Sequence, residues 1–524
     1  MSEQFSRDVE HTSVDRRKLF KYSLAGAAGM RGLLTAAGTS ALLGAAGVSR
    51  ANAQSTQLIV GMQGAAGTLD ARRVRAIPEQ QLFFALYDGL VDFDQDATIR
   101  PRLAESFERL DATSWRFKLR QGVKFHDGED FTAESVAFTF DQFKSLDPPF
   151  YYVNIWGPAW PPDVEIEADD SVIIRTPNPS PLLPNFLTRV GMLPTAAENP
   201  DFGESPIGTG PFKFSSWAKG DSVTLETNTD YWDGAPEIGG LVVRTIPEPA
   251  SQLAALQSGE IHIAFEPPVD QLDVLAPPDL GKLEARSTGL AQVLLNYRNP
   301  DSPIADVNVR TALKLAVDGE GMIGALLAGV AEAGIGPAPA SCFGALDAGG
   351  YPARDVEQAI SLLAEAGYQD GLDLTMIFTE GEFPRDTVIA EALISQLREI
   401  GANVELVQLD PGQYAERRNT ADWDIATNGT TGWTADAEYY INDVKTTLGY
   451  QSDELDALVL EAAAADDEDQ RVELLHQAQQ ILWDDVPYLW SFDVVLVLGV
   501  SSKISGVDLI PTSWILARDA SISG

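Results

Sequence analysis

WRFKLRQGVKFHDGEDFTAESVAFTF, residues 115–140, carries more information about the fold than any other stretch of the chain. Its first six residues alternate between apolar and basic side chains, and this period of two predicts a half-buried strand. Gly122 permits a turn into a second short run, which itself ends in turn residues. Thr132 is then a favoured N-cap for a helix that continues with apolar residues. The stretch therefore predicts a hairpin followed by a helix.

The first 53 residues predict where the protein works. Arg16 and Arg17 are adjacent, a mildly apolar Ala/Gly-rich run spans residues 24–48, and Ala51-Asn52-Ala53 has the small-x-small pattern of a cleavage site. We therefore predict a twin-arginine-type signal peptide over residues 1–53, cleaved near Ala53, and a mature protein in the periplasm. The alternative is an amphipathic helix in which two arginines are adjacent by chance. No later stretch reaches the ~18 apolar residues of a membrane span.

The composition predicts a large, folded and strongly acidic protein. Hydrophobic residues make up 44% of the 524 residues, and 77 acids against 37 bases give a net charge of −40. This charge argues against nucleic acid or an anionic membrane as partner. It is explained by solubility, with a cationic ligand as a second interpretation. The single cysteine, Cys342, permits no internal disulfide and is expected to be buried as a small hydrophobe.

The chain lacks the sequence signatures of the common catalytic and metal sites. It contains no GxxxxGK[ST], no GxSxG and no HExxH motif. Its four histidines are far apart and have no ligand-like neighbours at metal spacing. We therefore expect no catalytic residue, no metal site and no cofactor, and expect that the protein is not an enzyme. An exported hydrolase that uses some of the many carboxylates is the alternative.

The second half of the chain alternates between helices and strands, which predicts an α/β lobe. Period-two runs predict strands over residues 372–378, 404–409 and 423–428, and apolar residues at helical spacing predict helices over 355–366 and 387–400. The first half, from residue 56 to about 287, contains mainly strands, separated by loops that are rich in proline.

Two loops follow the carboxyl ends of these strands, where open α/β sheets bind ligands. One holds Arg385, and the other, residues 429–440, holds Trp433, Asp436 and Tyr439. An acid that pairs with an ammonium, an arginine that grips a carboxylate and a ring between them suit a zwitterion. The alternative is that Trp433 belongs to the core and Asp436 caps a helix.

Residues 115–140 resemble the signature of bacterial extracellular solute-binding proteins of family 5, the oligopeptide, dipeptide and nickel binders of ABC importers. Further stretches resemble other parts of this family in the same order. They are GTGPFKF (208–214), NTDYWDG (228–234), LAALQSGEIHI (253–263), NYRNPDSPIADVNVR (296–310), AISLLAEAGYQDG (359–371), residues 453–456 and residues 477–487.

The resemblance implies an α/β fold with two lobes, namely a type II periplasmic binding protein of the large class with an extra inserted domain. Transferred to this sequence, lobe I would be discontinuous and would comprise residues 54–90, 206–288 and 488–524. The inserted domain of lobe I would cover residues 91–205, and lobe II would cover residues 289–487.

The resemblance also implies roles for the candidate residues. Gly432 to Asp436 matches the Gly-Trp-x-x-Asp segment in which the family's peptide binders hold the peptide's amino group, so Asp436 inherits that role. Arg385 is the candidate for the carboxylate end. The sequence departs from the peptide binders after Asp436, where Ala437-Glu438-Tyr439-Tyr440 stands in place of the usual Asp-Pro.

The expected function is that of a periplasmic substrate-binding protein of an ABC importer. The resemblance implies that a monomer captures a small solute, a peptide or peptide-like compound, between its lobes and delivers it to the permease in the inner membrane. The alternatives for the solute are a metal chelate, haem, or an opine-like or sugar-like compound.

Overall fold

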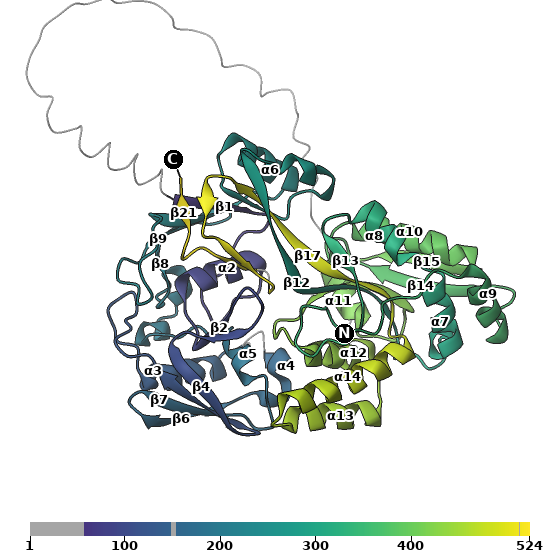
Figure 1. The fold of residues 1–524 in the computed structure, drawn as a ribbon, viewed down its shortest axis with the longest axis horizontal. Helices are drawn as coiled ribbons and strands as arrows, with labels where there is room; N and C mark the ends of the chain where they lie inside the picture. The colour runs from purple at the N-terminus through teal and green to yellow at the C-terminus, as the bar shows by residue number, and fades with distance from the viewer. Residues whose placement is uncertain (1–56, 148–152, 513, 524) are drawn as a thin grey trace, which may run out of the picture. The chain divides into compact units, whose positions relative to one another are not determined.

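Two long strands run through the centre of the computed structural model, which describes residues 57–147, 153–512 and 514–523. β12 (Leu280–Leu295) and β17 (Tyr488–Ser501) pair antiparallel along most of their length and lie side by side in Figure 1. Both belong to one 11-stranded sheet, ordered β15-β14-β16-β12-β17-β11-β1-β10-β9-β8, with β13 paired to β17. The predicted signal peptide lies outside the described residues.

The sheet has a parallel part on each side of β12 and β17. On one side, β1 (Gln57–Met62) pairs in parallel with β10 (Gly240–Thr245) and with β11 (Ile263–Phe265). On the other side, β14 (Leu372–Phe378) pairs in parallel with β15 and β16. The remaining strands of the sheet are β8 (Phe212–Ala218), β9 (Ser222–Thr227), β13 (Ala331–Ala333), β15 (Ala402–Gln408) and β16 (Ile425–Thr431).

The α/β prediction for the second half of the chain agrees with the structure, with two shifted strands. The strand predicted over 404–409 is β15, which begins two residues earlier, at Ala402. β14 has the predicted bounds, and α9 (Val356–Glu365) and α10 (Asp386–Glu399) lie where helices were predicted. The strand predicted over 423–428 is β16, which begins and ends later. Its last residues, predicted as loop, are strand because they pair with β12, Gly289 opposite Thr431.

Residues 115–140 form the predicted strand, which belongs to a smaller sheet, and the predicted helix. β5 (Ser114–Leu119) lies in a four-stranded antiparallel sheet with β4 (Ala104–Asp111), β7 (Ser171–Arg175) and β6 (Asp163–Ala168). Thr132 directly precedes α3 (Ala133–Lys144), as predicted. The second run of the predicted hairpin forms only an isolated bridge between Lys124 and Asp130. The predicted domain boundaries stay predictions.

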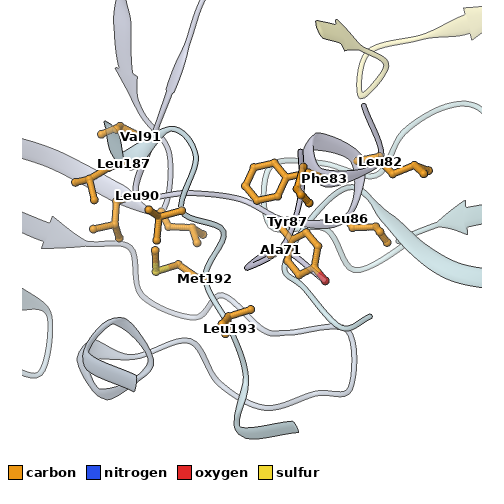
Figure 2. Close-up of a cluster of buried hydrophobic side chains, with 14 of the residues drawn as sticks. Ala71, Leu82, Phe83, Leu86, Tyr87, Leu90, Val91, Leu187, Met192 and Leu193 are labelled. Carbon is orange, nitrogen blue, oxygen red and sulfur yellow. The ribbon is translucent and has the colours of Figure 1, made fainter. Parts of the chain in front are cut away.

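The largest core cluster packs around the helix that follows β1. α2 (Ile77–Leu86) contributes Leu82 and Phe83. Figure 2 shows them with Leu90 and Val91, which follow the helix closely, and with Leu187, Met192 and Leu193 from a segment distant in the sequence. Cys342 is buried, which confirms the expectation of a core thiol.

None of the helices within residues 57–147, 153–512 and 514–523 combines the length and the apolar character needed to cross a membrane. The other helices are α4 (Val153–Trp156), α5 (Leu183–Leu187), α6 (Pro249–Ser258), α7 (Val307–Leu315), α8 (Gly319–Leu326), α11 (Pro411–Arg418), α12 (Ala437–Leu448), α13 (Asp453–Ala464) and α14 (Glu468–Asp485). The other short strands are β2 (Val91–Phe93), β3 (Ile99–Pro101), β18 (Ile504–Ser505), β19 (Asp508–Ile510), β20 (Trp514–Leu516) and β21 (Ser521–Ile522).

Candidate ligand-binding site

A cavity of about 670 Å³ lies where the parallel strands of both sides of the sheet end, and we call it the hinge cavity. From the first side it is lined by residues that follow β1, β10 and β11, and from the second by residues 381–385 after β14 and by the end of β16. Its floor includes Ser287 and Gly289 of β12 and residues 494–497 of β17. A ligand here would contact the carboxyl ends of strands on both sides, the usual binding position in open α/β sheets.

Arg385, a predicted site residue, lines the hinge cavity. It directly precedes α10 with φ of 61°, a left-handed conformation that is uncommon for a residue other than glycine. The buried Asp386 carboxylate fixes the loop, because it accepts the backbone N–H groups of Gly381 at 2.7 Å and Glu382 at 3.0 Å. Arg385 is exposed, and within the described residues its guanidinium forms no ion pair or hydrogen bond. The loop therefore presents a free cation to the cavity.

Two carboxylates line the same cavity, one from each of the two parallel parts of the sheet that flank β12 and β17. Glu266 follows β11 with φ of 51° and is exposed to the cavity, while Glu382 belongs to the loop that holds Arg385. Desolvation by the surrounding protein raises the pKa of both carboxyls above their usual range. The hinge cavity thus offers groups of both charges, which suits a polar or zwitterionic ligand.

A second cavity, of about 690 Å³, is lined on one side by aromatic and aliphatic residues of the segment 156–186, and we call it the aromatic cavity. Its opposite wall consists of α12 and α13 and includes Tyr439, another predicted site residue. The Tyr439 hydroxyl lies 3.3 Å from the hydroxyl of Thr430, which lines the hinge cavity. The two cavities therefore adjoin at this pair of hydroxyl groups.

Asp436 has an internal partner in the structure. Its side chain is 3% exposed. The carboxylate accepts hydrogen bonds from both terminal nitrogens of Arg471, from Nη1 to Oδ2 at 2.7 Å and from Nη2 to Oδ1 at 2.9 Å. It also accepts the backbone N–H of Glu438 at 2.9 Å as the N-cap of α12. The alternative interpretation, that Asp436 caps a helix, is confirmed. Its role toward a ligand amino group stays a prediction, because three of roughly four acceptor positions on the carboxylate are already occupied.

Trp433 is half-buried and lies beside residues of the first half of the chain. The guanidinium of Arg189 lies 4.7 Å from the centre of its ring and 5.4 Å from that of Phe84. Neither cavity is lined by Trp433 or Asp436, whereas Arg385 and Tyr439 line one each. The four predicted residues thus separate into two that line cavities and two that lie behind them.

A bulge in β12 connects the candidate loop to both sides of the molecule. The pairing of β12 with β17 shifts between Arg286 and Leu290. Inside this bulge, the Thr288 carbonyl accepts the N–H of Gly432 at 2.9 Å and the hydroxyl of Tyr440, while its own N–H donates to Pro511 O at 2.9 Å. Movement of β12 and β17, which we call the hinge strands, would therefore move the loop that holds Trp433 and Asp436.

Several residues of the site carry no signal in the sequence. Arg471 lies in α14, 35 residues after the carboxylate that it binds. Glu266 follows a three-residue strand in the other half of the chain. Asp443 lies on the cavity side of α12, a helix of which the sequence analysis predicted only a start at Asp436, as the alternative interpretation. Within the described ranges, no three His, Cys, Asp or Glu side chains are grouped as metal ligands are.

A sheet crossed by two long strands, with a cavity at the strand ends of both sides, defines the class of two-lobed α/β binding proteins. Residues 98–452 match the family model for bacterial extracellular solute-binding proteins, family 5 (Middle). The match covers more than half of the sequence, so the chain belongs to this family of solute-binding proteins, and the predicted family and fold class are confirmed.

Curated relatives resemble the chain over most of its length. A glutathione-binding protein of Pectobacterium atrosepticum is 26% identical over 461 residues, covering 84% of this chain and 89% of the relative. Haem-binding protein A of Haemophilus influenzae is 28% identical, covering 84% of this chain and 87% of the relative. The solved structure of HbpA2 from Haemophilus parasuis superposes with a TM-score of 0.80 at 23% identity, covering 89% of this chain and all of the other.

Proposed function

We propose that this protein captures a peptide or peptide-like solute between its two lobes and delivers it to the permease of an ABC importer. One observation carries the proposal, namely that the hinge cavity lies at the carboxyl ends of parallel strands from both sides of the sheet and is floored by β12 and β17. A solute there would contact both lobes at once, so that binding favours the closed arrangement. The glutathione binder among the relatives supports a peptide-like solute.

We propose that Arg385 receives the carboxylate end of the solute and that Tyr439 contacts its middle part. Arg385 is the free cation of the hinge cavity, and Tyr439 lies at the boundary of the two cavities. Trp433 and Asp436 would support the site from behind, with Asp436 acting through Arg471 and the start of α12. Glu266 and Glu382 are then the carboxylates available to a ligand ammonium in the hinge cavity.

The proposal includes export by the twin-arginine route, removal of residues 1–53, and work as a periplasmic monomer without a cofactor. The adjacent Arg16 and Arg17 and the cleavage pattern at Ala53 support it. Replacing both arginines by lysine should prevent export, measured as loss of the mature protein from the periplasmic fraction. Unchanged export would contradict the twin-arginine assignment alone.

Native mass spectrometry of protein purified from the periplasm tests the solute. A short peptide released from the protein, whose affinity falls at least tenfold with Arg385→Ala, is the expected result. Arg398→Ala, which removes a cation from the other end of the same helix, should leave the affinity unchanged. A solute that binds equally well to both variants would exclude the proposed role of Arg385.

A metal chelate, haem, or an opine-like or sugar-like compound is the second candidate solute. The haem binder among the relatives favours it, as does the absence of the usual Asp-Pro after Asp436. Recovery of such a compound would keep the receptor function and exclude the peptide. Peptidase or glycosidase activity of the purified protein would instead favour the exported hydrolase.

A further inference from the structure

The aromatic cavity combines an apolar wall with exposed apolar surface opposite. The rings of Trp156 and Phe186 are stacked, with centroids 5.1 Å apart and an interplanar angle of 21°, and Leu182 lies on the same wall. From α13, Leu460 faces the cavity and is 70% exposed, the largest exposed fraction among the large hydrophobic residues described. A ligand with an apolar body would remove this surface from water.

The opposite wall carries negative charge that its neighbours do not balance. Arg471 is the only guanidinium bonded to Asp436 and Glu438 among the described residues, so one negative charge of this group remains. Lys445 is already paired with Asp456 at 2.5 Å. Lys445, the cation that lines this cavity, is therefore not available to a second carboxylate.

Asp443 is the second unbalanced carboxylate of this wall. It accepts a hydrogen bond from the Thr447 hydroxyl at 2.7 Å and, among the described residues, has no cation within ion-pair distance. Arg418 is near enough to act on it through space, but its guanidinium donates to the side chain of Asn428. A carboxylate held in a partly desolvated cavity is unfavourable unless a counter-charge joins it.

We infer that the aromatic cavity binds a cationic group carried on an apolar body, such as an alkyl or aromatic amine or a guanidinium on a long side chain. This inference rests on the proposed function and adds the chemical class of the solute's second end. The ammonium would pair with Asp443 and Glu438, while the apolar body would contact the stacked rings and Leu460. An anionic or neutral group of the same size leaves the carboxylates without a counter-charge.

Three probes of equal size test the inference, namely 2-phenylethylamine, 2-phenylethanol and phenylacetate. Their affinities for the mature protein, starting at Gln54, are measured by ligand-observed NMR at pH 7. We expect the amine to bind at least tenfold more tightly than the alcohol, and phenylacetate to bind most weakly. Asp443→Asn should weaken amine binding about tenfold and leave the alcohol unchanged. Asp469→Asn, which removes the same charge from an exposed position on α14, should change neither.

Leu460→Trp provides a variant that occupies the cavity from an exposed position, so that its fold is easily preserved. It should abolish amine binding while the thermal unfolding midpoint stays unchanged. Equal binding of the three probes, binding of none, or an amine affinity that is insensitive to Asp443→Asn overturns the inference. Release of a natural solute without a cationic group from the periplasmic protein would also overturn it but would leave the receptor function standing.

Discussion

His126 shows how residues of the family signature act within this protein. Its Nδ1 accepts the backbone N–H of Gly208 at 3.2 Å, so Nε2 carries the hydrogen and donates to the carbonyl of Gly210 at 3.0 Å. The neutral ring thus joins the stretch 115–140 to the GTGPFKF stretch, through bonds between residues 82 and 84 positions apart in the sequence. Both motifs can be found in the sequence, but the bond between them cannot, because each motif alone predicts only a turn.

Acid should destabilise the protein through His126. Burial lowers the pKa of His126 to about 4, below its usual 6.5. Between pH 6.5 and 4, His126 is therefore protonated in the unfolded chain but stays neutral in the folded chain. Stability from this group is complete above pH 6.5 and falls by about 3 kcal/mol as the pH decreases towards 4. Urea unfolding at several pH values should show a shallower acid dependence in His126→Gln than in wild type. His476→Gln is the control, and an equal change in both variants would exclude this account.

Asp436 illustrates a residue whose type was predictable and whose partner was not. The Gly-Trp-x-x-Asp pattern and the rule for helix caps both selected it from the sequence. Arg471, which bonds both of its oxygens, is brought to it only by the packing of α14 against α12.

Asp436→Asn should destabilise the protein although asparagine caps helices as well as aspartate does. The substitution removes half of a buried ion pair, and because Glu438 still binds Arg471, we expect a loss of about 1–3 kcal/mol in the free energy of unfolding. Asp467→Asn, at the N-cap of α14, is a matched control that changes a cap without an ion pair and should lose less than about 0.5 kcal/mol. Equal losses in the two variants would contradict a contribution of the ion pair to stability. Weaker solute binding without any loss of stability would indicate a direct role of Asp436 at the ligand.

At the scale of elements, the sequence pattern predicted those helices and strands whose bounds depend on their own residues alone. β14 and α10 follow from apolar periodicity, and their bounds agree with the structure to within one residue or exactly. β16 was predicted two residues too early at its start and three too early at its end, because its glycine-containing end is strand only through pairing with β12. Propensity within one segment cannot include such a partner.

A buried carboxyl on β17 should make stability depend on pH in the opposite direction from His126. Burial raises the pKa of Asp493 to about 7; nearby Glu332 raises it further, while the N–H of Ala340 and Arg286 lower it. The folded state then holds a proton between pH 4 and 7 that the unfolded chain releases, so this group's contribution decreases as the pH rises through that interval.

Asp493→Asn should therefore stabilise the protein at pH 8 by on the order of 1–4 kcal/mol and have little effect near pH 4. Its Oδ1 has no hydrogen-bond partner among the described residues, so the neutral amide loses nothing on that side. Thermal unfolding of both proteins across this pH range measures the difference. A stabilisation that is the same at both pH values would show that Asp493 does not titrate in the interval.

At the scale of the whole molecule, the site is assembled from segments far apart in the sequence. The hinge cavity takes residues that follow β1, β10, β11 and β14, together with parts of both hinge strands. The sequence alone predicted the two loops after β14 and β16, because the rule for open sheets needs only one lobe. It could not predict Glu266 or the apolar wall of the aromatic cavity, since these depend on how the two halves face each other.

Contacts that residues 91–205 make with the second half of the chain, from the small sheet and from α5, should stabilise the closed arrangement. From β4, Arg109 donates to the carbonyls of Ala465 at 2.6 Å and Ala463 at 3.2 Å, and Asn185 donates to the carbonyl of Thr434 at 2.6 Å. These bonds connect the predicted inserted domain to the predicted lobe II. They should therefore break when the lobes separate.

Arg109→Ala should shift the protein towards an open form without unfolding it. Two bonds from a charged donor are lost, so we expect an increased radius of gyration by small-angle X-ray scattering and solute affinity weakened about tenfold, since fewer molecules occupy the binding-competent state. Arg116→Ala is the matched control, because this neighbouring arginine pairs only with Glu108 and Glu167 of its own sheet among the described residues. If both variants keep the wild-type radius and affinity, contacts other than those of Arg109 determine closure, and the hinge strands would set the arrangement of the lobes by themselves.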